Sequence, residues 1–412
     1  MSLNPDQQRA VDANGNVLIV ACPGSGKTHT LVSRAERLLG ASATSRLAIV
    51  TFGRAAADEL KERLVQRLGE AILPRVDAGT FHSLCLNQLA VTFPGPSRPF
   101  TIAEEWQLPV IYRKAWEEAR RSRRGSSVNL EQIRKGIEYA KANRGLIPDE
   151  PHAAEIKVAV DTYQKELAAH SLLDFADIIE LTVRGMDAGT VPRLGVSDLL
   201  VDEFQDTDAT QLDWVLAHAI GGVRITCVGD DDQSIFGFRF GQGYSGMRSL
   251  ASHTKAEVIT LDTTYRCCKD VVLHASCLIG RNTERVAKNI RTANTASGSV
   301  ERRDYLSFGD EVRDLVTSLR DRPAGESAAV LSRTNAILRD IATELEAEGV
   351  PYRCSKEASI WSGGAPGMVK GLIGASQGKE PKGITMALAA RGFTYDSTAA
   401  AMEALKAGSG SF

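Results

Sequence analysis

The stretch Ala21-Cys22-Pro23-Gly24-Ser25-Gly26-Lys27-Thr28 decides the fold of this chain. It follows an apolar run at residues 16–21 (NVLIVA) and precedes a helical pattern at residues 28–39 (THTLVSRAERLL). An apolar strand, a glycine-rich turn and a helix in this order are typical of a phosphate-binding P-loop. The glycines let backbone N–H groups curl around phosphate oxygens, and the N-terminus of the following helix adds a favourable dipole. The strict pattern has glycine at position 21, so the match is to a variant, and a chance glycine-rich turn is the alternative.

The side chains of this loop predict which ligand it binds. Lys27 is placed to reach the β- and γ-phosphates of a nucleoside triphosphate, and the Thr28 hydroxyl is placed to ligate Mg²⁺. We therefore predict ATP and Mg²⁺ as cofactors. The loop residues predicted to touch the nucleotide are Cys22, Pro23, Gly24, Ser25, Gly26, Lys27 and Thr28.

Apolar runs and helical patterns alternate on the C-terminal side of the loop. Buried strands are predicted at residues 46–52 (RLAIVTF), 196–202 (VSDLLVD) and 223–230 (VRITCVGD), and an amphipathic helix at residues 55–68. Alternating strands and helices indicate an α/β fold with a parallel, doubly wound sheet. Such sheets bind their ligands at the carboxyl ends of the strands, and two of these predicted strands end in acidic residues.

Two acidic motifs follow from those strands. In residues 201–206 (VDEFQD), Asp202 ends an apolar strand and suits a magnesium ligand, whereas Glu203 suits the base that activates water. In residues 229–239 (GDDDQSIFGFR), three consecutive carboxylates repel one another, so they require a nearby cation or good solvation. Gln233, which follows them, can hydrogen-bond a phosphate or a water in either orientation.

Aromatic and cationic residues interleave at the end of the second motif. Phe236, Phe238 and Phe240 lie beside Arg239 in the sequence. Aromatic rings next to a cation form a stacking platform for unpaired bases, and ordinary core aromatics are the alternative. A second group of cations indicates either a solvated helix face or a stripe that contacts phosphates: Arg113, Lys114, Arg120, Arg121, Arg123 and Arg124.

These patterns also divide the chain into segments. Residues 1–92 and 171–258 are predicted to form a first core domain that binds ATP. Residues 93–170, where the pattern is only helical, are predicted to form a helical insertion. Residues 259–375 are predicted to form a second, incomplete α/β domain, and residues 376–412 a tail of unclear structure that is rich in Gly, Ala and Ser.

Composition adds little about the ligand but bears on the compartment. The 412 residues carry a net charge of -2, so no global basic field indicates nucleic acid, although a binding groove needs only local positive charge. The seven cysteines include no metal-type pair, and their odd number favours reduced thiols in the cytoplasm. The sequence has no apolar run long enough for a membrane span.

With these motifs in place, the chain resembles the UvrD/Rep/PcrA family of superfamily 1 helicases from Leu3 to about Arg353. The resemblance implies two RecA-like domains, hydrolysis of ATP between them, and movement along single-stranded DNA from 3′ to 5′. It implies that Gln7 reads adenine, that Tyr265 stacks on adenine, and that Arg266 touches the γ-phosphate. The implied catalytic residues are Lys27, Glu203, Gln233 and Arg266. The implied nucleic-acid contacts are Thr51, Phe52, Thr80, Phe81, His82, Phe238 and Arg239.

Three departures from the family pattern are visible. His29, which completes the predicted nucleotide contacts, stands where the family often has Arg, and residues 53–55 (GRA) replace a Thr-Asn-Lys type of run. No His-x-Ala-Lys-Gly-Leu-Glu or Val-x-x-Thr-Arg-Ala run follows Arg353. The second domain, with a strand expected at residues 327–332 and a helix at residues 337–349, is therefore expected to be incomplete. Another chain completes it, the tail caps it, or the protein is truncated.

Three functions remain open on the sequence alone. The first is an ATP-dependent DNA translocase or helicase. The second is a module that binds ATP and single strands but needs a partner protein, which supplies the missing motifs, for turnover. The third is a P-loop kinase or another NTPase, and the run of aspartates at residues 230–232 and the Tyr265-Arg266 pair argue against it.

Overall fold

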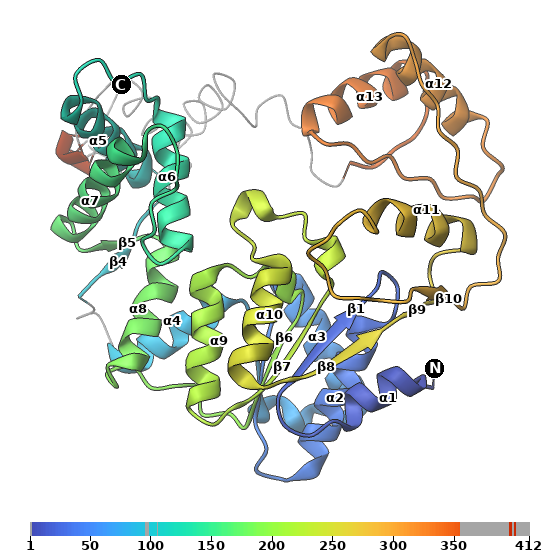
Figure 1. The fold of residues 1–412 in the computed structure, drawn as a ribbon, viewed down its shortest axis with the longest axis horizontal. Coiled ribbons are helices and arrows are strands. Elements are labelled where there is room, and N and C mark those ends of the chain that lie inside the picture. Colours follow the sequence, from blue (N-terminus) through green and yellow to red (C-terminus); the bar gives the residue numbers. More distant parts are fainter. Residues whose placement is uncertain (1, 95–98, 105, 355–394, 398, 401–412) are drawn as a thin grey trace, which may run out of the picture. The chain divides into compact units, whose positions relative to one another are not determined.

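The computed structural model describes residues 2–94, 99–104, 106–354, 395–397 and 399–400. They belong to two compact units, residues 1–299 and residues 300–412. Figure 1 labels the helices and strands of each unit. Most of the predicted tail, residues 376–412, lies outside the described residues, as does the end of the predicted second domain.

A six-stranded parallel sheet forms the centre of the first unit, in the order β3-β2-β6-β7-β1-β8. Its strands are β1 (Val17–Ala21), β2 (Leu47–Val50), β3 (Val76–Gly79), β6 (Asp198–Val201), β7 (Arg224–Gly229) and β8 (Glu257–Leu261). The predicted α/β fold with a parallel sheet is confirmed. β7 lies between β1 and β6, so the carboxyl ends of these three strands meet at one edge of the sheet.

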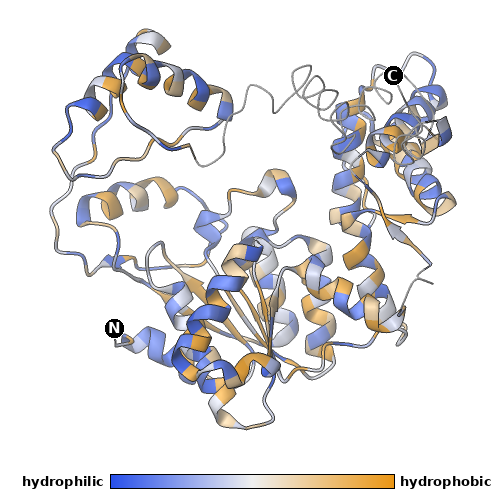
Figure 2. Cartoon of the chain, turned by 180° about the vertical axis from the view of Figure 1, so that it is seen from behind, coloured by the Kyte–Doolittle hydropathy of each residue, from blue (hydrophilic) through white to orange (hydrophobic). Residues whose placement is uncertain are grey.

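Strands β1 and β2 are entirely apolar and buried because helices cover both faces of the sheet. Successive side chains of a strand point to opposite faces. Leu18 and Val20 of β1 accordingly join one buried cluster, and Val17 and Ile19 join the other. Figure 2 shows the strands of the sheet in the colour of apolar residues. This double coverage holds the strand ends, and the loops that follow them, in fixed positions.

Each face of the sheet has its own set of helices. On one face lie α1 (Pro5–Asp12), α2 (Lys27–Ala41), α3 (Arg54–Leu68) and the 3-10 turn η1 (Glu70–Arg75). On the other lie α4 (Phe81–Thr92), α8 (Phe175–Asp187), α9 (Ala209–Ile220) and α10 (Gly243–Thr254). Three further 3-10 turns follow strands β6 and β7: η2 (Phe204–Asp206), η3 (Asp231–Gln233) and η4 (Gly237–Arg239).

The segment between α4 and α8 consists mainly of the helices α5 (Gln107–Ser122), α6 (Leu130–Ala142) and α7 (Ala153–Ala169). The two-residue strands β4 (Thr101–Ile102) and β5 (Leu172–Leu173) pair at its base. Four of the cations on and beside α5 form ion pairs with glutamates of this segment: Arg113 with Glu117, Lys114 with Glu166, Arg121 with Glu118 and Arg123 with Glu155. These pairs support the interpretation of a solvated helix face.

After β8, the first unit continues with two short strands and a helix. Strand β9 (Thr263–Thr264) pairs with β10 (Arg291–Thr292), and α11 (Lys269–Ile279) lies between them in the sequence. Because β8 pairs with β1, the first sheet extends to Leu261, three residues beyond the predicted boundary of the first domain. Within the described part of the chain, no helix has both the length and the apolar composition needed to cross a bilayer.

The described part of the second unit contains the helices α12 (Phe308–Arg320) and α13 (Asn335–Ala347). They pack through Val312, Val316, Ile341 and Leu345. The helix predicted at residues 337–349 is thus present, but the strand predicted at residues 327–332 is not formed. The backbone groups of a strand need a neighbouring strand as hydrogen-bond partner, and residues 300–354 include none.

Candidate active site and nucleic-acid interface

The loop between β1 and α2 has the backbone of a phosphate-binding turn. Gly24 and Gly26 have φ values of 73° and 80°, which favour glycine. The N–H of Ser25 donates to the carbonyl of Cys22 at 3.2 Å, and α2 begins at Lys27. A Cβ added to Gly24 would lie 2.5 Å from the Cβ of Arg266, so this glycine also allows a close approach of two segments. The loop therefore presents backbone N–H groups at the N-terminus of α2, as anion binding requires.

Residues far apart in the sequence surround this loop. The side-chain amide of Gln7 donates to the carbonyl of Ser25 at 2.8 Å, and its oxygen accepts from the N–H of Asn4 at 2.9 Å. The N–H of Tyr265 donates to the carbonyl of Gly24 at 2.9 Å. The side chain of Asn4 donates to the Tyr265 hydroxyl at 2.8 Å. The structure thus brings Gln7, Tyr265 and Arg266 to the loop, as the resemblance implies.

Two further predicted contacts flank the loop. Cys22 is fully buried, and its N–H donates to the carbonyl of Leu261 at 3.1 Å. Burial raises the pKa of the Cys22 thiol to about 11, so this cysteine is a packing residue in its thiol form. The Nδ1 atom of His29 lies 3.1 Å from Nη2 of Arg67 on α3. Because a guanidinium can only donate, Nδ1 accepts this hydrogen bond.

The acidic motif after β6 meets the lysine of the loop. The Nζ atom of Lys27 lies 2.9 Å from Oε2 of Glu203. Burial opposes ionisation of Glu203, but the Lys27 ammonium outweighs it and holds the pKa of this carboxyl below its usual value. Burial and the negative charge of Glu203 raise the pKa of the neighbouring Asp202 to about 6. Two residues 176 positions apart are in contact because only β7 separates β1 from β6.

The carboxylates beside Lys27 have the chemistry that Mg²⁺ requires. Asp202 and Asp206 both have a pKa of about 6, raised first by burial and then by the charge of Glu203. Oδ1 of Asp206 is buried and accepts no hydrogen bond from any described residue. Thr28 lies in the first turn of α2, next to Lys27. Buried, unsatisfied carboxylate oxygens are stabilised by a bound cation, so these residues fit a magnesium ion.

Gln233 is connected to Glu203 through a chain of hydrogen bonds. Its side-chain amide donates to Oδ2 of Asp230, and the N–H of Asp230 donates to Oε1 of Gln205 at 3.0 Å. The side-chain amide of Gln205 then donates to Oε2 of Glu203 at 2.9 Å. Our sequence reasoning did not select Gln205. Its only signal was its place two residues after Glu203.

Three members of the predicted stacking platform, Phe236, Phe238 and Arg239, lie together, whereas Phe240 packs edge-on against Tyr139 of α6. The rings of Phe52 and Phe236 stack with centroids 6.0 Å apart and an interplanar angle of 14°. Phe236 also packs against Phe238, with centroids 5.7 Å apart. The guanidinium of Arg239 lies 5.6 Å from the first of these rings and 5.7 Å from the second. Phe238 is 73% exposed and Phe52 is 43% exposed, so unpaired bases can reach both rings.

Three of the predicted nucleic-acid contacts belong to the scaffold. Phe81 is 5% exposed and packs edge-on against Trp214 in the core, with ring centroids 5.5 Å apart. Its ring cannot stack on a base, which corrects the expectation that a strand moves over it. Thr51 is also buried, and its hydroxyl donates to the carbonyl of Gly53 at 2.7 Å. Thr80 is the N-cap of α4. The hydroxyls of Thr51 and Thr80 bind the local backbone at the ends of β2 and β3, so they support the scaffold.

A cavity of about 450 Å³ extends from the platform to the helical segment. His82, Phe238 and Arg239 line it together with Phe175, which is not among the predicted site residues. His82 packs edge-on against Phe175, with centroids 5.5 Å apart, and burial lowers the pKa of its imidazole. Phe175 is 59% exposed. Phe175 thus adds an aromatic surface to the predicted nucleic-acid residues.

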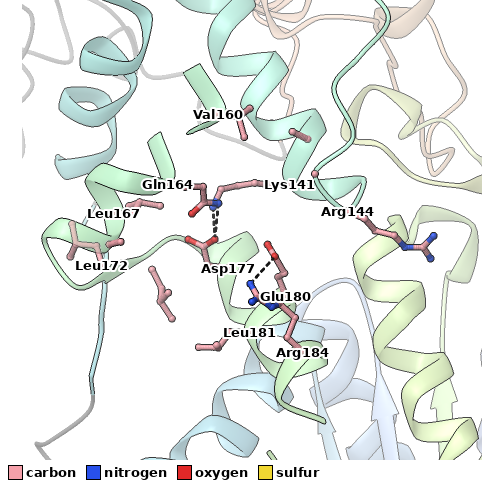
Figure 3. A pocket seen from close by; sticks show the side chains of 14 residues that line it. Lys141, Arg144, Val160, Gln164, Leu167, Leu172, Asp177, Glu180, Leu181 and Arg184 are labelled. Carbon is pink, nitrogen blue, oxygen red and sulfur yellow. Dashed lines mark hydrogen bonds and ion pairs between the residues drawn. The ribbon is translucent and has the colours of Figure 1, made fainter. Parts of the chain in front are cut away.

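A second cavity of about 450 Å³ lies between α6, α7 and α8, and it contains none of the predicted site residues (Figure 3). Its charged groups have ion-pair partners, and the partner of Arg144 is Asp213 of α9. Lys141 lies 2.6 Å from Asp177, and Arg184 lies 3.8 Å from Glu180. A second oxygen partner of Lys141 is Asp174, at 2.8 Å. The two Lys141 pairs fasten α6 to the start of α8, whereas the pair of Arg184 with Glu180 lies within α8. We therefore place the chemistry at the loop after β1.

Comparisons with known proteins agree with this placement. Residues 3–247 match the UvrD/REP helicase N-terminal domain, and residues 259–362 match the UvrD-like helicase C-terminal domain. The chain is similar to the ATP-dependent DNA helicase PcrA of Staphylococcus epidermidis, with 29% identity over 374 residues, 85% of this chain and 50% of that protein. It is also similar to DNA helicase II of Escherichia coli, with 30% identity over 380 residues, 85% of this chain and 51% of that protein.

The chain spans about half the length of these relatives. The match to the N-terminal model, from residue 3 to residue 247, covers more than half of the 412 residues. The six-stranded parallel sheet and the glycine-rich loop are the features that this match predicts. The chain therefore belongs to the UvrD/REP helicase family.

Proposed function

We propose that this protein is an ATP-dependent DNA translocase or helicase that moves along single-stranded DNA from 3′ to 5′. The observation that carries the proposal is the 2.9 Å contact between Lys27 and Glu203. It joins the phosphate-binding loop to the acidic motif at one edge of the sheet. Two similar proteins are an ATP-dependent DNA helicase and a DNA helicase II, and this similarity supports the same activity.

The residues around the loop are assigned roles by their positions. The N–H groups at the start of α2 bind the phosphates, and Thr28 and Asp202 hold Mg²⁺, which neutralises phosphate charge when bound. Gln7 and Tyr265 lie on the loop side where a base can bind. The arriving phosphates replace Glu203 as the partner of Lys27. The released carboxylate then orients a water and accepts its proton.

Two more groups act on the γ-phosphate end. Gln233 reaches the water or the phosphate from the loop after β7. Its hydrogen-bond chain to Glu203 fixes the positions of these two side chains relative to each other. The Cβ atom of Arg266 lies beside Gly24, at the edge of the phosphate-binding loop. Its guanidinium stabilises the negative charge that develops during phosphoryl transfer.

We place the single-stranded DNA on the surface formed by the exposed aromatic rings. Phe52, Phe236 and Phe238 offer stacking surfaces, and Arg239 supplies positive charge beside them. Stacking on such rings tolerates any base sequence, because every base has a flat face. Phe238 lies five residues after Gln233, so a change at the γ-phosphate is transmitted to the platform over a short segment.

Steady-state ATP hydrolysis with and without single-stranded DNA tests the proposal. We expect DNA to stimulate hydrolysis and Lys27→Ala to abolish it. A Lys61→Ala variant, which removes a lysine of α3 that is not among the predicted site residues, is the matched control and keeps the wild-type rate. No stimulation by any single strand contradicts the proposed function. A duplex with a 3′ tail, unwound in preference to one with a 5′ tail, tests the direction.

A second candidate function is a module that binds ATP and single strands but reaches turnover only with a partner chain. The sequence through Phe412 has no Val-x-x-Thr-Arg-Ala run, which supplies a second arginine to the γ-phosphate in the family. Mixing the chain with a polypeptide that carries this run discriminates between the candidates. Unaided unwinding of a 3′-tailed duplex excludes the partner-dependent module.

We also propose a cytoplasmic location. None of the seven cysteines, all of which lie in the described residues, forms a disulfide. Free thiols persist in the reducing cytoplasm, and most disulfides form outside it.

A further inference from the structure

The loop after β7 holds three carboxylates that meet two cations from a distant segment. The ammonium of Lys288 lies 2.5 Å from Asp230, 2.7 Å from Asp231 and 2.8 Å from Asp232. Arg285 binds Asp232 through two hydrogen bonds of 2.8 and 2.6 Å. Two cations against three carboxylates leave a single excess negative charge. The cation that this acidic run requires is thus part of the chain itself.

This cluster is buried, so its geometry is tightly constrained. The side chains of Lys288, Asp230 and Asp231 are completely inaccessible to solvent. Burial alone favours a neutral amine, but Asp230 and its neighbours raise the pKa of the Lys288 ammonium above its usual value. The backbone N–H of Val286 adds a 2.6 Å hydrogen bond to Asp231. A charge buried this deeply persists only with such partners, so Lys288 and the carboxylates must stay together.

Asp230 connects this cluster to the groups proposed for hydrolysis. Its Oδ1 accepts from Lys288, its Oδ2 accepts from Gln233, and its N–H donates to Gln205. Gln205 in turn donates to Glu203. Removing the ammonium of Lys288 therefore leaves Asp230 with an unpaired buried charge. The least costly response is a movement of the carboxylate, which takes Gln233 with it.

We infer that Lys288 and Arg285 are positioning residues for ATP hydrolysis, which hold Gln233 and Glu203 in register through Asp230. They tie the loop after β7, within the N-terminal family match, to residues 285–288, within the C-terminal family match. Their cationic groups pair with the aspartates of this loop, so we assign them a role through Asp230 and not a direct contact with nucleotide or DNA. This inference rests on the proposed function, because the step that they support is the hydrolysis assigned to Glu203.

The test compares Lys288→Met, Gln233→Ala and the double variant in the full chain. We expect kcat of DNA-stimulated hydrolysis to fall about tenfold in Lys288→Met, while the affinity for a fluorescent ATP analogue changes less than about threefold. Because Lys288 acts through Gln233, the double variant is expected to lose no more than about twofold beyond Gln233→Ala. Arg46→Met, whose exposed ion pair lies at the opposite edge of the sheet, is the control with wild-type kcat.

Two outcomes overturn the inference: a folded Lys288→Met protein with kcat within about twofold of wild type, or losses that multiply fully in the double variant. If Lys288→Met fails to fold, Arg285→Met replaces it, because that ion pair is partly exposed. The same outcomes then decide. Amide exchange at residues 229–239 gives a readout without activity, and we expect faster exchange in Arg285→Met but not in Arg46→Met. A wild-type protein that does not hydrolyse ATP contradicts the proposed function, whereas an active wild type with unaffected variants contradicts this inference alone.

Discussion

Replacing Glu203 by glutamine separates nucleotide binding from turnover. In the structure, the Glu203 carboxylate pairs with the Lys27 ammonium, the group that we propose binds the phosphates of ATP. On this proposal, the carboxylate competes with the nucleotide for Lys27 before it serves as a base. Because the Lys27 ammonium holds the pKa of Glu203 below its usual value, the carboxylate is ionised at neutral pH and the substitution removes a full charge.

The size of the effect on binding follows from the exposure of the pair. Lys27 is 14% exposed and Glu203 is 40% exposed. Solvent screening limits such a pair to about 1 kcal/mol. Removing the competitor is therefore expected to tighten ATP binding by up to about fivefold. Loss of the base that activates water is expected to lower kcat by about a hundredfold or more.

Two assays on one preparation measure these quantities. Titration of a fluorescent ATP analogue gives the affinity, and a coupled assay with saturating single-stranded DNA gives kcat. Glu59→Gln, which removes an exposed ion pair with Arg63 on α3, is the matched control and leaves both values unchanged. A Glu203→Gln protein that loses affinity in proportion to kcat refutes the reasoning, because Glu203 is then structural.

Three further predictions concern other parts of the site. Phe238→Ala is expected to weaken single-strand binding by about 1–3 kcal/mol with unchanged ATP affinity, whereas Phe81→Ala is expected to lower the free energy of unfolding by about 3–5 kcal/mol; fluorescence anisotropy and denaturant melts distinguish them. Asp202→Asn is expected to stabilise the metal-free protein at pH 8 by about 1–3 kcal/mol, because burial raises the pKa of Asp202 from 3.8 to about 6 in the folded state and ionisation above that pH costs stability. This gain vanishes at pH 3, where the carboxyl is protonated in both states, and an equal change at both pH values contradicts it. Lys114→Met is expected to leave single-strand affinity within about twofold, because Glu166 already neutralises this lysine, and a larger loss measured by anisotropy restores the phosphate-stripe interpretation.

Local sequence patterns were sufficient to predict strands that form from their own apolar residues. The apolar runs at residues 16–21, 46–52, 196–202 and 223–230 became β1, β2, β6 and β7 because a short continuous apolar run is typical of a strand that is buried on both faces. The same reasoning failed at residues 327–332, which are apolar but have no neighbouring strand in the described part of their unit. A strand forms only when its backbone can hydrogen-bond to a neighbouring strand, and an apolar sequence does not reveal whether such a neighbour exists.

The direction in which a side chain points is a second feature that the sequence pattern did not predict. Phe81 and Phe238 both follow motifs that predict contact with a strand of nucleic acid. Phe81 faces Trp214 in the core, and Phe238 faces solvent. Phe81 is the first residue of α4, and the sequence of a first helical turn does not state which way that turn faces. Docking of the whole helix on the sheet decides it.

By itself, the sequence determined the parallel sheet, the phosphate-binding loop and the acidic residues Asp202 and Glu203, since each depends on residues within one short segment. Only the tertiary structure decided that Lys27 meets Glu203, that Phe52 stacks on Phe236 and that Lys288 neutralises the aspartates after β7. These contacts join segments that are far apart along the chain. They depend on the strand order and on which ends share an edge of the sheet, and the distance between residues in a sequence carries no record of either.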